Sequence, residues 1–486
     1  MESRIKLLFV GGDLSGIQKF IYNITSKKAM VSLKGRSAYL NEYMKKVCKR
    51  ILDIPDIKSS PNTRTVYDSG GKFYLIVDDT PENINQVELV RKQVEHELWK
   101  EHYGQLGLSI CYVPFSFEGG KVIVDGSEPE NIGILWRKIS EKFNDRKNQK
   151  YKELLLESYD EFFETTEVGE KPQVCAITGI EGKCVPLQDN DDEEDIMVLP
   201  SVREQIKLGQ RIREKEHFKT FEEYADGSYL GILRMDVDRL GSLFAQGFES
   251  FDDYKAISGR LDAFFSGQDG NPSVLQDIVK KYDECVNIVY AGGDDLFAIG
   301  KWNSVIDFAA EVQKLFATHF NDTGITISGG ISIVGPKFPI SKSAELAGVA
   351  EETAKNFNGG EKNAFCLFGE AISWNTEFDY VREYKDKFIE MIHRGLSKGL
   401  LHQIIRYSSI VRQNRQIECG EYEGRKDLSY LWHTSYYMTR YIDRCGSDDV
   451  IKSFCKDLRD RQLINARRYE LLSVAARWAE LLLRNE

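Results

Sequence analysis

The segment Asn287-Ile-Val-Tyr-Ala-Gly-Gly-Asp-Asp-Leu-Phe-Ala-Ile299 joins two apolar runs through a Gly-Gly-Asp-Asp tip. Short apolar runs on either side of glycines predict a β-hairpin. Upstream, Gly231-Ile-Leu-Arg-Met-Asp-Val-Asp238 predicts a buried strand. Downstream, a helical pattern over Val305–Phe320 precedes a strand over Ile325–Val334. This order predicts a β-α-β-β-α-β domain of the ferredoxin-like, α+β type.

The same layout occurs once before, near the start of the chain. A strand that ends at Asp13 and a hairpin with Gly70 at its tip precede a helical pattern over Val87–Tyr103 and a strand over Leu108–Val113. The interval from the strand-end aspartate to the hairpin glycine is about 57 residues here and about 56 in the second copy, a match that chance seldom gives. The chain therefore contains two similar halves.

Patterning extends this organisation to the whole chain. We expect two ferredoxin-like palm domains at residues 1–115 and 223–375, an α-rich linker domain at residues 116–222, and a C-terminal helical bundle at residues 376–486. The linker has a helical pattern near Glu153–Phe163 and an acidic loop at Asp189–Asp195. Helical spacing after Trp374 is found in Ile404–Val411, Tyr436–Ile442 and Leu471–Leu483.

The composition excludes several classes of protein. No run approaches the roughly 18 apolar residues of a membrane span. The nine cysteines are scattered and odd in number, which favours a reducing cytoplasm over a disulfide scaffold. The net charge of −11 argues against bulk attraction to nucleic acid. Any RNA contact is therefore expected to be local or to be made through partner proteins.

Three carboxylates of the second half, those of Asp236, Asp294 and Asp295, are expected to meet, because a strand end and the neighbouring hairpin tip are adjacent in a ferredoxin-like sheet. Such a trio is repulsive unless a cation lies between its members. Mg²⁺ or Mn²⁺ prefers oxygen ligands, and two ions about 4 Å apart activate a hydroxyl and hold a leaving pyrophosphate. The alternative is a solvated hairpin tip with a capping aspartate.

Glycines and a lysine suit the phosphates of a nucleotide. Gly292 and Gly293 permit a tight turn and let the backbone approach a phosphate with no Cβ in the way. Lys355, on a helix expected over Ala344–Phe357, is placed to reach a β- or γ-phosphate. An ordinary exposed helix lysine is the alternative for Lys355.

The first half lacks the set of carboxylates. In the alignment of the two halves, Lys72 and Phe73 stand where the paired aspartates stand, and Ser15 replaces Asp238. One aspartate cannot hold two metal ions, but the glycine-rich turns and Lys72 suit a second nucleotide that serves as acceptor. Holding both reactants in place supplies much of a rate enhancement. A purely structural role of the first half is the alternative.

Five motifs occur in order along the chain: Gly12-Asp-Leu-Ser-Gly-Ile-Gln-Lys-Phe-Ile21, Leu33-Lys-Gly-Arg-Ser-Ala-Tyr-Leu40, Ser69-Gly-Gly-Lys-Phe73, Arg234-Met-Asp-Val-Asp238 and Gly292-Gly-Asp-Asp295. Together they resemble the large polymerase/cyclase subunit of type III CRISPR effector complexes, of the Csm rather than the Cmr type. The motifs span both palms, and the resemblance covers nearly the whole chain.

The resemblance implies synthesis of 3′-5′-linked cyclic oligoadenylates from ATP when target RNA pairs with CRISPR RNA, in a prokaryotic cytoplasm and together with other effector subunits. It implies that Asp236, Asp294, Asp295 and the Val237 carbonyl hold two Mg²⁺ or Mn²⁺ ions. An ATP in the second palm would be the donor, and the 3′-hydroxyl of an ATP in the first palm would attack its α-phosphate. The candidates for nucleotide contacts are Ser15, Gly16, Gly70, Gly71, Lys72, Ser266, Gly292, Gly293 and Lys355.

Two departures from the family pattern lead to further expectations. Many relatives begin with an HD nuclease domain, whereas here the palm starts within the first ten residues and no His-Asp dipeptide occurs. The resemblance therefore implies signalling without DNA cleavage. Relatives often carry two Cys-x-x-Cys pairs between the palms, but here Cys175 and Cys184 remain, and Leu199-Pro-Ser-Val202 stands at the second pair. A closed zinc site needs four ligands, so we expect no structural zinc unless Asp189 or His217 supplies the missing ones.

Other functions remain open at this point. One alternative hypothesis is a catalytically silent scaffold for the RNA-bearing subunits. Another is an enzyme that joins AMP to another small molecule, such as S-adenosylmethionine, instead of closing a ring. Basic residues of the C-terminal bundle would meet neighbouring subunits or RNA, or would lie on solvated helix faces. They are Arg406, Arg412, Arg415, Arg467 and Arg468.

Overall fold

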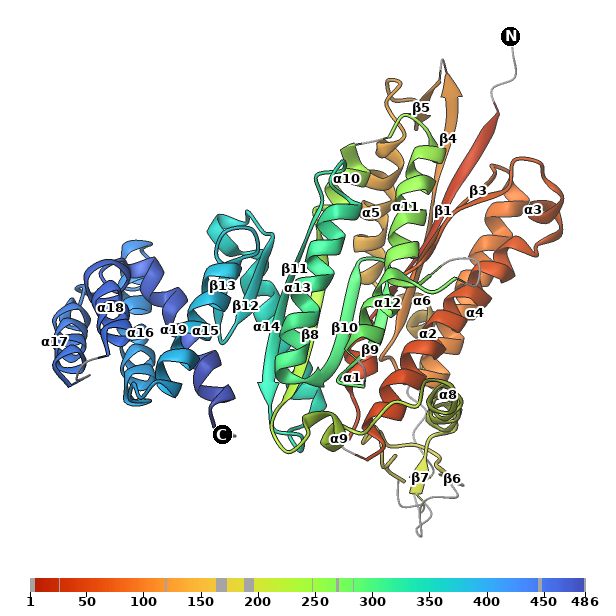
Figure 1. Ribbon diagram of the computed structural model, residues 1–486. Helices are drawn as coiled ribbons and strands as arrows, with labels where there is room; N and C mark the ends of the chain where they lie inside the picture. Colours follow the sequence, from red (N-terminus) through yellow and green to blue (C-terminus); the bar gives the residue numbers. More distant parts are fainter. Residues whose placement is uncertain are drawn as a thin grey trace. The chain divides into compact units, whose positions relative to one another are not determined.

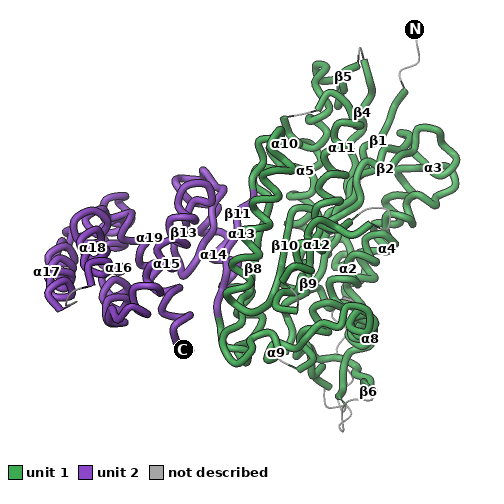
Figure 2. The backbone as a smooth tube through the Cα atoms, in the orientation of Figure 1, with its two compact units in different colours: residues 1–326, 334–345 green, residues 327–333, 346–486 purple. Residues whose placement is uncertain are grey.

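The computed structural model describes residues 5–25, 27–118, 120–162, 173–187, 196–246, 248–267, 271–282, 284–444 and 448–484. The chain divides into two compact units (Figure 1, Figure 2). Unit 1 contains residues 1–326 and 334–345, and unit 2 contains residues 327–333 and 346–486. No helix in the described ranges is long and apolar enough to cross a membrane. The expected α+β architecture with palm-type strand order is confirmed.

The first half has the predicted order of elements. Its strands lie in the order β2–β3–β1–β4, and every neighbouring pair is antiparallel, which is the ferredoxin-like arrangement. The central strand β1 is apolar on both faces, and Leu8, Phe9 and Val10 are fully buried. The elements are β1 (Lys6–Ser15), α1 (Ile17–Tyr22), α2 (Ala29–Leu52), α3 (Pro55–Ser59), β2 (Arg64–Ser69), β3 (Lys72–Asp78), α4 (Pro81–His102) and β4 (Gly107–Glu118).

Helix α4 begins six residues before the predicted start at Val87 because of a local cap. The Thr80 side chain accepts a hydrogen bond from the Asn83 amide at 3.1 Å, and Pro81 takes the first helical position. Both residue types favour a helix start, since a hydroxyl satisfies a free amide and proline needs no amide partner. The sequence pattern missed the first turn because Ile84 alone gives no helical spacing of apolar residues there.

His102, the last residue of α4, is 3% exposed. Its Nε2 lies 2.8 Å from the Tyr39 hydroxyl, and the buried Arg36 lies nearby. Burial, and then the positive charge of Arg36, lower the pKa of His102 to about 4 from its ordinary value of 6.5. The folded protein therefore keeps this imidazole neutral over a pH range in which the unfolded chain protonates it.

We expect His102 to lower the free energy of unfolding by about 2 kcal/mol between pH 7 and pH 5. The folded-state pKa is depressed, so the stabilisation is present above about pH 6.5 and is lost as the pH falls towards 4. Denaturant unfolding of His102→Gln should lack this part of the pH dependence. The control His96→Gln, which changes another histidine of α4, should retain it. Equal pH dependences of the wild type and His102→Gln would contradict the assignment.

The first sheet continues beyond the predicted end of its fourth strand. β4 extends to Glu118, and β5 (Lys121–Val124) pairs with it as a fifth strand. Helix α5 (Gly133–Lys147) packs on the sheet, where Gly11 leaves room for it: a Cβ at Gly11 would lie 2.6 Å from Ile139 Cδ1. Residues after 115 thus help to build and cover the first sheet, and the four-domain division stays a prediction.

The segment between the halves adds short elements and one longer helix. They are α6 (Lys152–Glu157), α7 (Tyr159–Phe162), β6 (Val185–Leu187), β7 (Ile196–Val198), α8 (Pro200–Glu216) and α9 (Phe221–Ala225). α8 packs against α2 backbone to backbone, because Gly35 and Gly209 leave no side chain between the two helices. The helix predicted near Glu153–Phe163 is α6 followed by α7, and Phe163 and the acidic loop Asp189–Asp195 lie outside the described residues.

The second half repeats the arrangement of the first. β8 pairs antiparallel with β10, and β10 pairs with β9, as β1 pairs with β3 and β3 with β2. The predicted hairpin is therefore confirmed. The elements in unit 1 are β8 (Leu230–Asp238), α10 (Leu240–Gln246), α11 (Phe251–Phe265), α12 (Val274–Lys281), β9 (Val286–Gly292), β10 (Asp295–Lys301) and α13 (Trp302–His319).

The two halves share one aromatic core within unit 1. Phe9 of the first sheet and Trp136 of α5 pack with Phe251 and Tyr254 of α11. The Trp136 and Tyr254 rings stack with their centroids 4.1 Å apart. All four side chains are buried, and aromatic side chains contribute the largest apolar areas to a core. This core holds α11 and the second palm against the first sheet.

Unit 2 is mainly helical, as predicted for the end of the chain. The segments predicted as helical lie in α16, α17 and α19. β11 pairs parallel with β12, and β12 pairs antiparallel with β13. The elements, of which the first two begin in unit 1, are β11 (Thr326–Val334), α14 (Ile340–Lys355), η1 (Phe357–Gly359), β12 (Ala364–Leu367), β13 (Glu370–Ser373), α15 (Phe378–His393), α16 (Gly399–Glu418), α17 (Ser429–Arg444), α18 (Asp449–Asp457), η2 (Leu458–Gln462) and α19 (Ala466–Leu482).

Three C-terminal arginines bind buried glutamates inside unit 2. Arg412 and Arg415 both pair with Glu370, and Arg415 and Arg467 pair with Glu470 at 3.0 and 3.2 Å. Glu370 and Glu470 are 3% and 1% exposed, and a buried carboxylate requires charged partners. These three arginines thus contribute ion pairs to the packing of unit 2. Contact of the C-terminal arginines with RNA or neighbouring subunits stays a prediction.

Candidate active site

The carboxylates of Asp236, Asp294 and Asp295 meet between the end of β8 and the tip of the β9–β10 hairpin. Asp295 lies directly opposite Asp236 in the antiparallel pairing of β10 with β8. The Val237 amide donates a hydrogen bond to the Asp294 carbonyl at 3.0 Å, which holds the tip against the strand end. One oxygen from each of the three half-buried side chains lies within 4.8 Å of the others.

This donor set fits a hard divalent cation. Mg²⁺ binds oxygens at about 2.1 Å, so opposite ligands of one ion are about 4.2 Å apart. Three carboxylate oxygens within 4.8 Å need only small side-chain rotations to share one ion or to bridge two. Among the residues that the structure describes, no other group of three or more His, Cys, Asp or Glu side chains has this spacing. The metal-binding role stays a prediction.

The hairpin tips of the two halves touch at Gly70 and Gly293, a contact that we call the glycine seam. Their φ angles are +59° and +66°, in the left-handed region that glycine adopts at little cost. A Cβ at Gly70 would lie 2.7 Å from the Gly293 Cα, and a Cβ at Gly293 would lie 3.3 Å from the Tyr67 hydroxyl. The two backbones therefore approach as closely as they do because both residues lack a side chain.

The strand register corrects the alignment of the two tips by one residue. Lys72 lies opposite Asp13 as Asp295 lies opposite Asp236. Lys72 thus corresponds to the second aspartate of the pair, not to the first. Phe73, which the sequence alignment placed at the second aspartate, is a fully buried core residue.

The corrected register makes the two glycines of the seam equivalent positions. The interval from the strand-end aspartate to the seam glycine is then equal in both halves. Contact between equivalent residues is what an approximate two-fold relation between duplicated domains produces. The two palms therefore face each other through the same part of their fold.

Two tyrosines, the partly buried Tyr67 and the buried Tyr290, lie beside the seam. Burial raises the pKa of Tyr67 and of Tyr290. The negative charge of Asp262 then raises the pKa of Tyr67, that of Asp295 raises the pKa of Tyr290, and Asp294 adds to both. The Tyr290 hydroxyl donates to the Gly292 carbonyl at 3.4 Å. Both phenols therefore stay protonated at neutral pH, so neither is a general base.

Ser266 and Lys355, two of the predicted nucleotide contacts, have different surroundings. The Ser266 hydroxyl donates to the Ala291 carbonyl at 3.4 Å and lies 3.8 Å from the place of a Cβ at Gly292, so Ser266 is next to the second tip. Lys355, in unit 2, pairs with the buried Glu351 at 2.8 Å and is 26% exposed. Lys355 is thus half-buried and not an ordinary exposed helix lysine. Nucleotide contacts of both residues stay predictions.

In the first palm a lysine forms an ion pair with the aspartate near the end of β1. Lys147, the last residue of α5, places its Nζ 2.6 Å from Asp13 Oδ2, and the Asp13 side chain is 10% exposed. The Ser15 hydroxyl donates to the Gly107 carbonyl at 2.9 Å. Sequence reasoning missed Lys147 because it lies in the segment assigned to the linker. The available signal was the repeat itself, since Lys147-Asn148 ends one helix as Lys355-Asn356 ends another.

The linker contains the two remaining cysteines of the zinc-ribbon pattern. Cys175 and Cys184 are both buried. Burial raises the pKa of Cys184, and the electrostatic effect of the neighbouring Cys175 raises it further. Asp189 lies outside the described residues, and His217 follows the last residue of α8 with a left-handed φ of 49°. The absence of a structural zinc stays a prediction.

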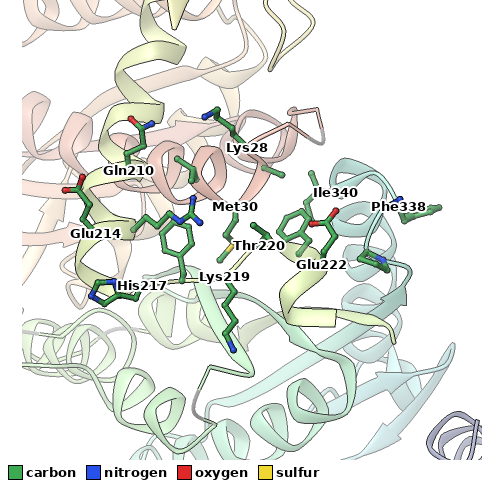
Figure 3. Close-up of a pocket in the computed structure, with 17 residues that line it drawn as sticks. Lys28, Met30, Gln210, Glu214, His217, Lys219, Thr220, Glu222, Phe338 and Ile340 are labelled. Carbon is green, nitrogen blue, oxygen red and sulfur yellow. The ribbon is translucent and has the colours of Figure 1, made fainter. Parts of the chain in front are cut away.

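A cavity of about 1160 Å³ opens beside His217 (Figure 3). Met30 and Ile340 contribute buried apolar surface, while Lys28 and Glu214 bring charges of both signs. None of the residues predicted to bind Mg²⁺, Mn²⁺ or nucleotide lines this cavity. It is therefore separate from the candidate active site.

Two family descriptions match the chain. Residues 6–167 match the Csm1 subunit domain B, and residues 229–366 match the second palm domain of Cas10/Cmr2. The first match covers Asp13 and Lys147, and the second covers the three aspartates of the candidate site.

Curated relatives are described as CRISPR system single-strand-specific deoxyribonuclease Cas10/Csm1 of subtype III-A. The Enterococcus italicus protein is 28% identical, with 79% of this chain and 57% of the relative covered. The Streptococcus thermophilus protein is 26% identical, with 92% of this chain and 64% of the relative covered. This chain thus spans less than two thirds of the length of these relatives.

Solved structures of Csm1–Csm4 cassettes share the fold. The cassette in complex with one ATP gives a TM-score of 0.68 at 19% identity, covering 98% of this chain and 70% of the other. The cassette in complex with cA4 gives a TM-score of 0.67 at 19% identity, covering 99% and 70%.

Proposed function

Because the chain is a homologue of the Cas10/Csm1 subunits of subtype III-A CRISPR systems, we propose that it condenses ATP at a metal-dependent site in its second palm. The proposed product is 3′-5′-linked oligoadenylate closed into a ring, made within an effector complex when target RNA pairs with CRISPR RNA. The observation that carries the proposal is the trio of carboxylates beside the glycine seam. DNA cleavage, which the names of the relatives describe, is no part of it.

Each residue of the second palm has a proposed role. Asp236, Asp294 and Asp295 would hold Mg²⁺ or Mn²⁺ with the Val237 carbonyl, and such ions supply the positive charge that activates a hydroxyl and neutralises a leaving pyrophosphate. Gly292 and Gly293 leave room for phosphates, and Ser266 offers a hydroxyl beside them. Lys355 is proposed to add a positive charge for the β- and γ-phosphates.

The first palm is proposed to bind the acceptor ATP. Its predicted contacts are Ser15, Gly16, Gly70, Gly71 and Lys72. Contact between equivalent glycines supports this role, because nucleotides bound at the two tips would lie face to face. Bringing two reactants together in this way accounts for a large part of many rate enhancements. Solved cassettes in complex with ATP, AMPPNP, pppApA and cA4 agree with a condensing function.

The products made from ATP test the proposal. The full chain, assembled with its effector subunits and CRISPR RNA, is incubated with ATP and Mn²⁺, with and without target RNA, and the products are identified by mass spectrometry. We expect cyclic oligoadenylates that are formed only when target RNA is present. An AMP conjugate formed only after addition of S-adenosylmethionine would replace the ring-closing part of the proposal. No ATP-derived product, and no Mn²⁺-dependent binding of ATP, would leave the scaffold role instead.

A further inference from the structure

The first palm has a lysine at one position where the second palm has a carboxylate, and further lysines lie near its strand-end aspartate. Lys147 binds Asp13, and Lys72 stands opposite the same aspartate. Lys150, three residues further along the chain, lies next to Gly107, the first residue of β4. Gly107 makes room for it, because a Cβ there would lie 2.5 Å from the Lys150 Cε and 3.2 Å from the Ser15 hydroxyl.

The partners of Lys147 and Lys150 differ in charge. Lys150 donates to the Gly104 carbonyl at 2.7 Å, which is a neutral partner. Burial, and then the positive charge of Lys19, lower the pKa of Lys150. Ser15, Lys147 and Lys150 line the same cavity of about 20 Å³, together with Arg91, Glu95 and Arg146. It has room for about one water molecule, so a phosphate group would bind at its mouth. A phosphate group would relieve the repulsion between Lys150 and Lys19.

Lys147 and Lys355 occupy equivalent positions in the internal repeat. α5 follows the β4–β5 strands of the first palm, and α14 follows β11, the corresponding strand of the second. Each helix ends with Lys-Asn, and each lysine is held by a carboxylate, Asp13 in one case and Glu351 in the other. The two lysines thus share a place in the order of elements, although Asp13 lies at a strand end and Glu351 lies one turn earlier on the same helix as Lys355.

We propose that Lys147 and Lys150 bind the triphosphate of the nucleotide in the first palm without a metal ion, and that Asp13 holds the Lys147 ammonium in position. The inference deepens the proposed function, on which it rests for the assignment of an acceptor site. An ammonium group has three N–H donors, of which Asp13 takes one, and the Lys147 side chain is 35% exposed. The Lys147 ammonium would neutralise Asp13 in the first palm, as a bound metal ion would neutralise Asp236 in the second. The two palms then differ in kind: one binds phosphate through fixed lysines and the other through carboxylates and added ions.

Binding of ATP in EDTA isolates the first palm. We expect the full chain carrying Asp294→Ala and Asp295→Ala to bind one ATP, with a Kd that rises about tenfold to hundredfold on Lys147→Gln, since a charge-assisted hydrogen bond is lost. Lys142→Gln is the matched control, because Lys142 lies on α5 and donates to the Tyr112 carbonyl at 2.8 Å. Its Kd should equal that of the parent. No metal-free binding by the parent, or equal Kd values for all three proteins, would overturn the inference.

A second variant separates phosphate binding from folding. Lys147→Gln alone leaves the buried Asp13 carboxylate without its cation, which destabilises a fold. Asp13→Asn combined with Lys147→Gln replaces the ion pair by a neutral pair. We expect the double variant to regain thermal stability and to keep the weak ATP binding. Recovery of the parental Kd would show that Lys147 acts only in folding. Loss of condensation in a protein that still binds ATP in EDTA would instead concern the proposed function.

Discussion

Replacing Asp294 and Asp295 together by alanine should abolish ATP condensation, with a loss of at least about 1000-fold in rate. The substitution removes two of the three carboxylates that lie within 4.8 Å of one another. Asp236 alone cannot hold two metal ions. Metal ions contribute several kcal/mol of transition-state stabilisation, and about 4 kcal/mol corresponds to a factor of about 1000. The chain should still fold and assemble, because both side chains are half-buried at a hairpin tip.

Three measurements on the same samples check this result: product formed from ATP, Mn²⁺ bound per chain, and thermal unfolding in EDTA. Removing two mutually repelling carboxylates should leave the unfolding temperature in EDTA equal or higher. The control replaces two exposed aspartates of the same palm, Asp252 and Asp277, by alanine, and should keep both product and Mn²⁺. Normal product from the Asp294→Ala, Asp295→Ala protein would refute the site.

Gly70→Ala should lower the rate of condensation about 100-fold, although Gly70 lies in the palm without the carboxylate trio. The new Cβ would lie 2.7 Å from the Gly293 Cα and 3.0 Å from its amide nitrogen, so a backbone rather than a flexible side chain must move. Gly293 precedes Asp294, and a displacement of about 1 Å at a reacting centre costs about 100-fold.

Gly126→Ala provides a control with the same backbone requirement and no neighbour. Gly126 has φ +72°, close to the +59° of Gly70, and an added Cβ there would meet nothing within 4 Å. Both variants lose about 1 kcal/mol of stability to the left-handed conformation. Only Gly70→Ala should lose condensation activity. Equal rates for the two variants would show that the glycine seam does not position the site.

The order of the elements and the meeting of the three aspartates followed from the sequence, because both depend on short-range patterns. Apolar runs around glycines mark the β9–β10 hairpin, and the sheet topology then brings Asp295 opposite Asp236. Neither step requires knowledge of contacts between distant segments. The prediction of two similar halves rested on the same local signals, repeated at equal spacing.

Features that depend on distant contacts were not predictable in this way. Lys147 meets Asp13 across more than a hundred residues of sequence, and no local pattern marks a lysine that binds a strand-end carboxylate. The tips were aligned one residue apart because Gly-Gly occurs in both, whereas β2 ends before its glycines and β9 ends at Gly292. Glu370 and Glu470 gave no sign of burial, since a glutamate in sequence is most often exposed.

The stacking of Trp136 on Tyr254 makes the duplicated palms inseparable as modules. A fragment that ended before β8 would expose Trp136 and Phe9 to water, and a fragment that began there would expose Tyr254 and Phe251. Each piece would carry a large apolar surface of the kind that drives aggregation. The two halves therefore depend on each other to bury this core, so a substitution at the contact affects the stability of both.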